Sequence, residues 1–277
     1  MLNGLYIDEI ILNALKEDMP FGDITTDNII SESSVSRGNF VAKESGVIAG
    51  LDICGRVFAL LDPGIRFSKK IKDGECVKSG DIIAGIEGNS RAILKGERTA
   101  LNLLQRMSGI ATMVNEFSRR IEGTDAKLVD TRKTTPGLRI LEKYAVKAGG
   151  GSNHRFSLSD GVLIKDNHIK AAGGIRRAVE LTRGNIPHTV KVEVETETLE
   201  QVQEALDAGA DIIMLDNMNL ETMKQAVRKV NKRALVEASG NVNLDTIHDI
   251  ASTGVDIISV GALTHSVKAF DISLRFI

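Results

Sequence analysis

A repeating alternation of short apolar stretches and amphipathic segments constrains the fold of this chain more than any other feature of its sequence. Between the apolar stretches lie segments such as TLEQVQEALDAG, whose apolar residues are three and four positions apart, as in a helix. The last three intervals between apolar stretches are roughly 22 residues each, which suits β-α units that feed a parallel sheet. The six predicted strands are residues 126–130, 161–165, 189–195, 211–216, 234–239 and 256–261.

Six β-α units can form either a doubly wound sheet or an open, incomplete (β/α) barrel. Gly-Ala-Asp at residues 209–211 and Thr-Gly-Val-Asp at residues 253–256 each indicate a helix end that leads directly into a strand. Such short connections are typical of (β/α) barrels. The sequence therefore favours an open α/β barrel of about six parallel strands.

The first 115 residues follow a different pattern, which predicts an N-terminal α/β sandwich domain. Residues 6–16 place Ile7, Ile10 and Ile11 on one face of a predicted helix, and short segments punctuated by glycine follow. The segment at residues 73–89, DGECVKSGDIIAGIEGN, resembles half of a lipoyl-type sandwich. No lysine occupies the hairpin tip, however, which disfavours a swinging-arm carrier.

A long helical stretch at residues 91–121 connects the two halves, and Ser108-Gly109 predicts a break within it. We therefore predict a sandwich domain at residues 1–115 and a catalytic open-barrel domain at residues 116–265. The C-terminal tail, about residues 266–277, is expected to pack on the first domain.

Composition excludes several classes of protein. The formal net charge of −2 gives no basic excess for nucleic acid. No apolar run approaches the roughly 18 residues of a membrane span, and the N-terminal stretch has acids and no cleavage site of the secretory kind. Two cysteines, Cys54 and Cys76, make neither a disulfide framework nor a zinc site. We expect a cytoplasmic globular protein.

Positive charge is concentrated between residues 130 and 170, around the triple glycine at residues 149–151. This stretch contains eight Lys or Arg and two His, against four acids. Arginine binds carboxylates and phosphates through two hydrogen bonds, and lysine acts as a mobile point charge. The local charge therefore predicts anionic ligands.

Polar or small residues end every predicted strand, which is where barrels of this kind hold their sites. A solvated turn, a surface lysine or a helix cap would explain any one of these ends, but six together indicate one site. Small residues after late strands can bind phosphate through backbone N–H groups, and carboxylates suit Mg²⁺. Neither a Walker A loop nor a G-x-G-x-x-G after a strand is present. The candidates are Thr131, Arg132, Lys133, Lys165, Glu193, Glu195, Asp216, Asn217, Ser239, Gly240, Asn241, Val260, Gly261 and Ala262.

Several long motifs resemble those of the quinolinate phosphoribosyltransferase family. They are ERTALNLLQRMSGIAT (97–112), DTRKTTPGLR (130–139), EKYAVKAGGGSNHR (142–155), LIKDNHI (163–169), IIMLDN (212–217), EASGN (237–241) and VGALTHS (260–266). The resemblance runs in order from about Asp18 to the C-terminus. It implies that quinolinate and phosphoribosyl pyrophosphate react, with Mg²⁺, to give nicotinate mononucleotide, pyrophosphate and CO₂.

The resemblance also implies roles for individual residues. The pyridine dicarboxylate would be held by Arg132, His154, Arg155 and Lys165, with Lys133 between the base and the pyrophosphate. The ribose hydroxyls and Mg²⁺ would face Glu195 and Asp216. The 5-phosphate would be held by Ser239, Gly240, Gly261 and His265. Arg98 would complete the site of a neighbouring subunit, which implies a homodimer or a higher oligomer.

Glu193 and Glu195 are two residues apart on the third predicted strand, so alternation places both on the same side and cannot choose between them. The family's functional glutamate lies close to the following helix, and counting back from Asp216 selects Glu195.

Charge favours transfer of the phosphoribosyl group before decarboxylation, because a pyridinium ring can stabilise the carbanion that CO₂ leaves behind.

Three alternatives have other chemistry. A relative of the same fold would use a pyridine base without decarboxylation, or would be the molybdenum-locus relative with an unsettled substrate. A Schiff-base aldolase would use Lys165 as its nucleophile. A phosphosugar-binding barrel would bind ligand without turnover, but it would gain nothing from the negative charges of Glu195 and Asp216.

Overall fold

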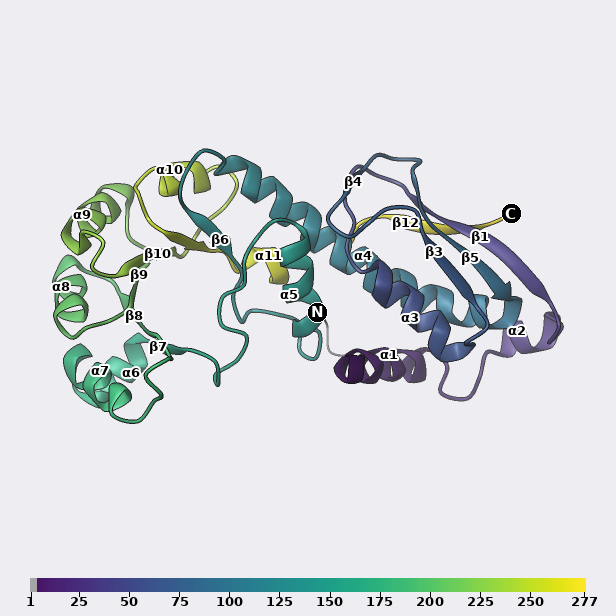
Figure 1. Ribbon diagram of the computed structural model, residues 1–277, viewed down its shortest axis with the longest axis horizontal. Coiled ribbons are helices and arrows are strands. Elements are labelled where there is room, and N and C mark those ends of the chain that lie inside the picture. The colour runs from purple at the N-terminus through teal and green to yellow at the C-terminus, as the bar shows by residue number, and fades with distance from the viewer. Residues whose placement is uncertain (1–3) are drawn as a thin grey trace. The chain divides into compact units, whose positions relative to one another are not determined.

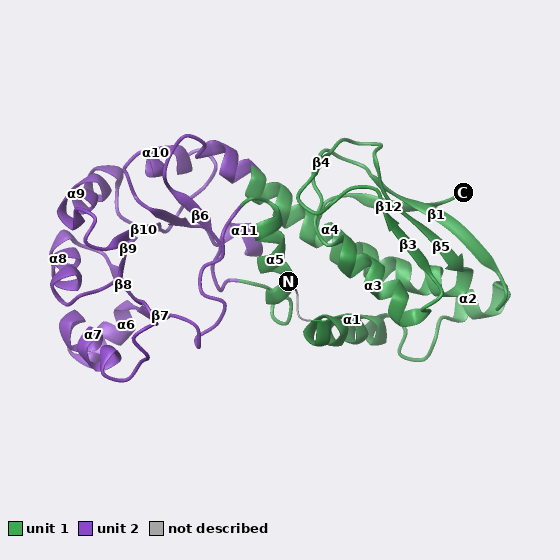
Figure 2. Cartoon of the chain, in the orientation of Figure 1, with its two compact units in different colours: residues 1–115, 134–150, 266–277 green, residues 116–133, 151–265 purple. Residues whose placement is uncertain are grey.

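The computed structural model of the chain describes residues 4–277 and divides into two compact units (Figure 2). The sequence assigned residues 134–150 to the barrel domain, whereas in the structure they cluster with the N-terminal unit. The first unit comprises residues 1–115, 134–150 and 266–277, and the second comprises residues 116–133 and 151–265.

The second unit contains a six-stranded parallel sheet in the order β6-β11-β10-β9-β8-β7. From β7 to β11 the strands lie side by side in chain order, and β6, the first strand of the unit, lies beside β11, the last. This is the order of a barrel, whereas the strand order of a doubly wound sheet reverses. Within residues 4–277 no pairing joins β6 to β7, so the predicted open barrel is confirmed. The strands are β6 Lys127–Val129, β7 Val162–Ile164, β8 Val192–Thr196, β9 Ile212–Asp216, β10 Leu235–Ser239 and β11 Ile257–Ser259.

Helices follow the strands of this sheet, and Figure 1 shows α7, α8 and α9 along its outer side. Two of them begin at residues that cap their free N–H groups. Thr198 accepts a hydrogen bond from the backbone of Gln201 (3.3 Å), and Asn219 accepts one from Thr222 (2.9 Å). The helices are α6 Asp166–Ala172, α7 Ile175–Arg183, α8 Leu199–Asp207, α9 Leu220–Val230, α10 Ile247–Ala251 and α11 Ala262–His265.

Alternation along the strands separates the core from the site. In β8, Val192 and Val194 are fully buried, as are Ile213 and Leu215 in β9. The residues between them point to the opposite face of the sheet. The apolar set therefore packs the core of the unit, and the polar set is left for the inner side of the barrel.

The first unit is built on an antiparallel sheet in the order β12-β1-β5-β3. Helix α3 packs on it through Phe58, whose ring lies 6.0 Å from that of Phe40 on β1. The C-terminal strand β12 pairs along β1, from Gly38 with Phe276 to Ala42 with Ile272. The elements are α1 Gly4–Asp18, α2 Ile24–Ile29, β1 Val35–Ala42, β2 Gly46–Val47, α3 Leu51–Leu61, β3 Arg66–Lys69, β4 Cys76–Val77, β5 Ile82–Asn89, α4 Ser90–Arg120, α5 Arg139–Ala148 and β12 Ile272–Phe276.

The predicted break at Ser108-Gly109 is wrong, because α4 runs without interruption from Ser90 to Arg120. Both residues make close contacts instead of ending the helix. The hydroxyl of Ser108 accepts a hydrogen bond from the backbone of Ala49 (3.1 Å), and a Cβ at Gly109 would collide with the backbone carbonyl of Lys268. The glycine is required by close backbone packing within the first unit, which a sequence pattern cannot distinguish from a helix stop.

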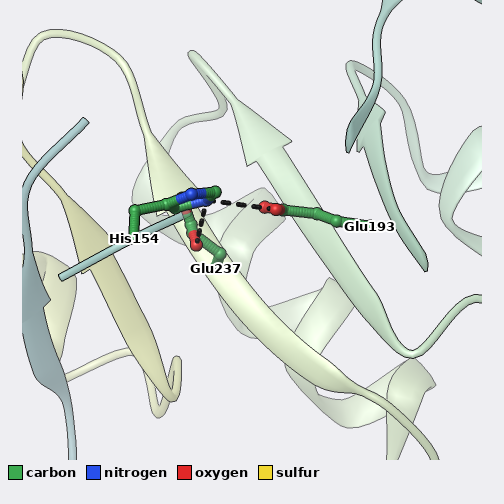
Figure 3. Close-up of side chains that lie close together, drawn as sticks. All are labelled: His154, Glu193 and Glu237. Carbon is green, nitrogen blue, oxygen red and sulfur yellow. Dashed lines mark ion pairs between the residues drawn. The ribbon is translucent and has the colours of Figure 1, made fainter. Parts of the chain in front are cut away.

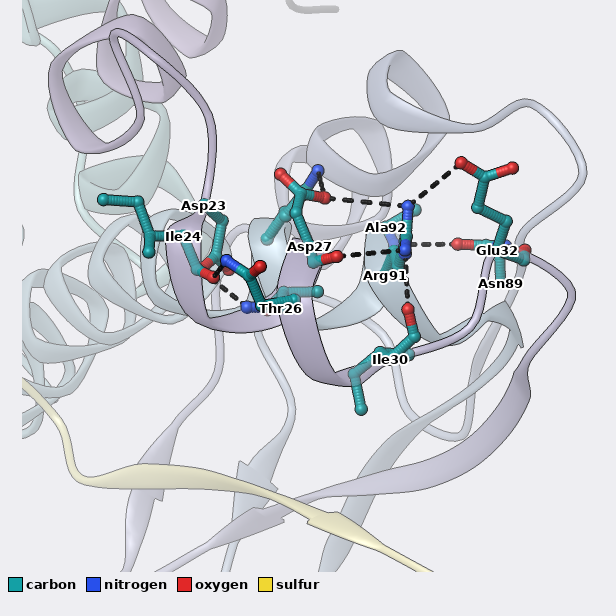
Figure 4. A network of polar contacts seen from close by, with 11 residues as sticks. Asp23, Ile24, Thr26, Asp27, Ile30, Glu32, Asn89, Arg91 and Ala92 are labelled. Atoms are coloured by element: carbon teal, nitrogen blue, oxygen red, sulfur yellow. Dashed lines mark hydrogen bonds and ion pairs between the residues drawn. The ribbon is translucent and has the colours of Figure 1, made fainter.

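A polar network joins α2 to the beginning of α4 within the first unit (Figure 4). Asp23 caps α2 by accepting a hydrogen bond from the backbone of Thr26 (3.0 Å). Arg91 donates to the carbonyl oxygens of Ile30 (2.7 Å) and Asp27 (3.2 Å). These bonds satisfy carbonyl groups at the end of α2, which are the groups that a helix leaves without internal partners.

Candidate active site

One cavity of about 780 Å³ collects nearly all of the residues that the sequence singled out. It lies within the second unit, at the carboxyl ends of the parallel strands. Arg98 differs, because it lies on α4 in the first unit. The predicted residues that line the cavity are Thr131, Arg132, Lys133, His154, Arg155, Lys165, Glu195, Asp216, Asn217, Ser239, Gly240, Asn241, Val260, Gly261, Ala262 and His265.

The sequence analysis missed a second row of lining residues. Leu163, Met214, Glu237 and Ser259 also line the cavity. Each of these four residues lies two positions before a predicted residue, namely Lys165, Asp216, Ser239 or Gly261. Because side chains alternate along a strand, a step of two returns to the same face. That signal was present in the sequence and could have identified Glu237 in particular.

The loop before β7 is anchored by Asp130, which is fully buried just after β6. Its carboxylate accepts hydrogen bonds from the side chain of Asn153 (2.6 Å) and from the backbone of His154 (2.9 Å). A bridge between Val129 and Ser152 holds the same loop alongside the strand. The anchor therefore fixes the backbone from which the next two side chains reach the cavity.

Replacing Asp130 with alanine is expected to lower the free energy of unfolding by about 1–3 kcal/mol, because it removes a carboxylate that accepts two partly buried hydrogen bonds. It should also lower kcat/KM roughly 10²-fold, because small displacements of substrate-binding groups are costly. Chemical denaturation and steady-state kinetics measure the two effects. Asp166→Ala, at an exposed acid of α6, is the control. Equal behaviour of the two variants would contradict the anchoring role.

Both ring nitrogens of His154 have partners within the protein. Nδ1 accepts a hydrogen bond from the backbone N–H of Arg155 (2.7 Å). Nε2 lies 3.1 Å from a carboxylate oxygen of Glu193 and 3.5 Å from one of Glu237 (Figure 3). A nitrogen that accepts a hydrogen bond carries no hydrogen, so the neutral ring holds its hydrogen on Nε2.

Two guanidinium groups lie close together in the cavity. Arg155 is half-buried, and its Nη1 donates to the carbonyl oxygen of Gly161 (2.9 Å). Burial and the neighbouring charge of Arg132 lower the pKa of Arg155. The carboxylates of Glu193 and Asp160 offset part of the repulsion between these like charges. A ligand with a carboxylate or phosphate would offset it further, so the pair suits an anionic ligand.

Carboxylates from β8 and β9 face the same cavity as the cations. Glu195 pairs with Lys165 (Nζ–Oε2 3.1 Å), and Asp216 accepts a hydrogen bond from the side chain of Asn217 (2.9 Å). Glu195 lines the cavity and Glu193 does not, although the two share one face of β8. His168 accepts a hydrogen bond from the backbone of Lys165 (2.9 Å), which caps α6 and fixes the end of β7.

Glu195 and Asp216 are carboxylates of this cavity that could hold part of the coordination shell of a magnesium ion. Mg²⁺ usually takes one or two protein carboxylates together with waters and substrate phosphates. The two residues end adjacent parallel strands, and both line the cavity. Two carboxylates at this edge can hold part of the coordination shell and leave the rest to phosphate oxygens.

Two glycines make room for the side chains around them. Gly240 has a φ of +95°, and a Cβ there would overlap the amide of Asn217. At Gly261 a Cβ would lie 3.0 Å from Cδ of Lys133 and 3.1 Å from Nε2 of His265. Glycine at these positions brings Lys133 and His265 close to the backbone. We call the residues Thr131, Ser239, Gly240, Asn241, Val260, Gly261, Ala262 and His265 the small-residue side of the cavity, and backbone N–H groups on such a side suit a phosphate.

The chain matches two family models over most of its length. Residues 23–108 match the model described as "Quinolinate phosphoribosyl transferase, N-terminal domain", and residues 110–275 match that of the C-terminal domain.

None of the helices formed by residues 4–277 combines the length and apolar character that a membrane span requires.

Named relatives resemble the chain along its full length. A protein of Bacillus subtilis named "Probable nicotinate-nucleotide pyrophosphorylase [carboxylating]" is 46% identical, over 99% of this chain and 94% of its own. Nicotiana tabacum "Quinolinate phosphoribosyltransferase [decarboxylating] 2b, mitochondrial" is 43% identical, over 97% and 82%. The crystal structure of NadC from Streptococcus pyogenes superposes with a TM-score of 0.96 at 43% identity, over 99% of this chain and 97% of that one.

Proposed function

Because this chain belongs to the quinolinate phosphoribosyltransferase family, we propose that it makes nicotinate mononucleotide for NAD biosynthesis. It transfers the phosphoribosyl group of phosphoribosyl pyrophosphate to quinolinate and releases pyrophosphate and CO₂. The observation that carries this proposal is the gathering of Arg132, Lys133, Arg155 and Lys165 around one cavity. Such a set suits a dicarboxylate beside phosphate groups.

The positions of the side chains support a division of the cavity. Arg132, Arg155 and Lys165 hold the two carboxylates of quinolinate, and His154 lies beside them. Lys133 lies between the base and the pyrophosphate. Glu195 and Asp216 face the ribose hydroxyls, and the 5-phosphate lies against the small-residue side of the cavity. That side is formed by Thr131, Ser239, Gly240, Asn241, Val260, Gly261, Ala262 and His265.

Charge determines how these residues act on the reaction. As pyrophosphate leaves C1 of the ribose, negative charge grows on the leaving group, and Lys133 and the arginines stabilise it. A bound magnesium ion would add a Lewis acid at the same phosphates. Attack by the pyridine nitrogen on C1 makes a pyridinium ring, which stabilises the electron pair left on C2 when the 2-carboxylate departs as CO₂. Transfer therefore precedes decarboxylation.

Removal of divalent cations with a chelator is expected to lower turnover at least about 10²-fold, with recovery on adding Mg²⁺. Glu195→Gln should raise the KM for phosphoribosyl pyrophosphate roughly tenfold, because a carboxylate that faces Mg²⁺ is lost. Titrating activity with Mg²⁺ measures both effects. Glu197→Gln, at an exposed glutamate just beyond β8, is the control. A Glu195→Gln variant with unchanged Mg²⁺ dependence would remove this residue from the metal site.

A comparison of two bases tests the function. Purified protein is incubated with phosphoribosyl pyrophosphate, Mg²⁺ and either quinolinate or nicotinate, and nicotinate mononucleotide is measured. We expect product from quinolinate and at least about 10²-fold less from nicotinate, because the cations that bind the missing carboxylate are left unpaired. Product from nicotinate alone would overturn the assignment of the cation cluster.

The oligomeric state is a prediction. In a homodimer, Arg98 of a second copy of the chain would complete the site, and sedimentation of the wild type and of an Arg98→Ala variant would test this.

The cytoplasmic location is also a prediction, and fractionation of cells that express the protein would test it.

A further inference from the structure

His154 forms a buried cluster with Glu193 and Glu237, and the binding scheme above gives these two glutamates no role (Figure 3). His154 Nε2 lies 3.1 Å from an oxygen of Glu193 and 3.5 Å from an oxygen of Glu237. Both glutamates are almost fully buried, at 3% and 1% exposed. The other oxygen of each has no hydrogen-bond partner among the described residues. Buried carboxyl oxygens without partners are costly, so this arrangement requires an explanation.

A metal ion is one explanation, because ligand atoms of all three residues lie within 4.8 Å of one another. The histidine ring disfavours it. Nδ1 accepts a hydrogen bond from the backbone of Arg155, so the hydrogen of the neutral ring is on Nε2 and points to the carboxyl groups. A histidine that binds a metal normally donates from its other nitrogen, which is the reverse of this arrangement. The ring therefore favours donation from Nε2 to the carboxyl groups over binding of a metal ion.

The two glutamates differ in their access to the cavity. Glu237 lines it and Glu193 does not. Burial, followed by the neighbouring charge of Glu193, raises the pKa of Glu237, which favours the protonated form of its carboxyl group. Among the described residues, the polar groups that face Glu237 are Glu193 on β8, His154 before β7 and Ser259 on β11. Met214, beside it on β9, adds no charge.

The proposed reaction, on which this inference rests, needs a proton at one carbon atom. When the bond between C2 and its carboxylate breaks, CO₂ leaves and the electron pair stays on C2 of the pyridinium ring. The product has a hydrogen at C2, so a donor must supply a proton there. Arginine cannot serve, because it does not lose its proton in proteins. An acid whose pKa lies near the working pH is the most effective donor.

We propose that Glu237 is the acid that protonates C2 of the pyridine ring after CO₂ has left, and that Glu193 and His154 hold its carboxyl group in place. The electron pair on C2 takes the proton of the Glu237 carboxyl group and forms the C–H bond. Glu237 becomes a carboxylate, and water that enters the cavity after product release returns the proton.

Two isosteric variants of the full-length protein test this proposal. Glu237→Gln removes the acid, whereas Glu193→Gln alters the same cluster and keeps the carboxyl group at position 237. We expect Glu237→Gln to lower kcat for quinolinate at least about 10²-fold with KM changed less than about threefold. Glu193→Gln should lower kcat less than about tenfold. The wild-type rate should fall at alkaline pH as Glu237 loses its proton. This fall should move to lower pH in Glu193→Gln, because the charge that raises the pKa of Glu237 is removed, and it should be absent in Glu237→Gln.

The opposite outcomes overturn the proposal. Equal losses of kcat in the two variants would mean that the cluster only positions the loop of His154. A stoichiometric metal that is present in the wild type and lost in Glu237→Gln would mean a metal site. If the wild type releases no CO₂ from quinolinate, the proposed function fails. If it does, and Glu237→Gln keeps wild-type kcat, only the role of Glu237 fails.

Discussion

Replacing Arg155 with alanine is expected to lower kcat/KM for quinolinate by roughly 10²- to 10³-fold, with a much smaller effect on the KM for phosphoribosyl pyrophosphate. A guanidinium group makes two charged hydrogen bonds to a carboxylate, and each contributes about 1.5–3 kcal/mol. The half-buried position of Arg155 reduces the screening of these bonds by water. Steady-state kinetics with each substrate varied in turn measures the effect.

Two further variants show whether geometry or charge is responsible. Arg155→Lys keeps the charge and loses the paired donors, so its kcat/KM should fall between those of the wild type and Arg155→Ala. Arg177→Ala, at an exposed position of α7 in the same unit, should leave kcat/KM unchanged. A rise in the KM for phosphoribosyl pyrophosphate alone in Arg155→Ala would assign this arginine to the phosphates instead.

The second large effect concerns stability: Arg106→Ala should lower the free energy of unfolding by about 3 kcal/mol. Arg106 pairs with Glu142 (Nη2–Oε1 2.6 Å), whose side chain is 1% exposed. The same carboxylate accepts a hydrogen bond from the backbone of Thr135 (3.1 Å), so it holds residues 134–150 to α4 within the first unit. Truncation of the arginine leaves a buried negative charge without its cation.

Urea unfolding of Arg106→Ala measures this loss, and an exposed pair in the same unit supplies the control. Arg37 pairs with Glu87 at 2.9 Å, but the two side chains are 66% and 36% exposed. Arg37→Ala should therefore cost less than about 1 kcal/mol. Similar losses in the two variants would show that burial of Glu142 does not determine the strength of the Arg106 pair.

The periodicity of apolar residues was enough to predict the architecture of the second unit, because each strand there buries one of its faces and each helix buries the apolar residues along one side. The alternation in KVEVETE placed Glu193 and Glu195 on one side of the strand, and in the structure Val192 and Val194 are buried on the other side. Alternation does not show how deeply a side chain is buried, however. It could not show that Glu193 is buried and pairs with His154, while Glu195 lines the cavity and pairs with Lys165.

Contacts between distant segments were beyond the reach of local patterns. Gly109 resembles a helix stop in sequence, and only the backbone of Lys268 shows why glycine is needed there. Residues 134–150 continue the barrel segment in sequence but cluster with the N-terminal unit. Glu237 was missed because it lies inside an apolar stretch and not at its polar end, although a step of two residues from Ser239 places it on the same face of β10.

The ratio of CO₂ to pyrophosphate is the most direct test of decarboxylating transfer. Quinolinate labelled in its 2-carboxylate is incubated with the protein, phosphoribosyl pyrophosphate and Mg²⁺, and labelled CO₂ and pyrophosphate are counted together. We predict one CO₂ for each pyrophosphate, with no label left in the mononucleotide. Release of pyrophosphate with the label retained in the product, or release of CO₂ without pyrophosphate, would contradict the account.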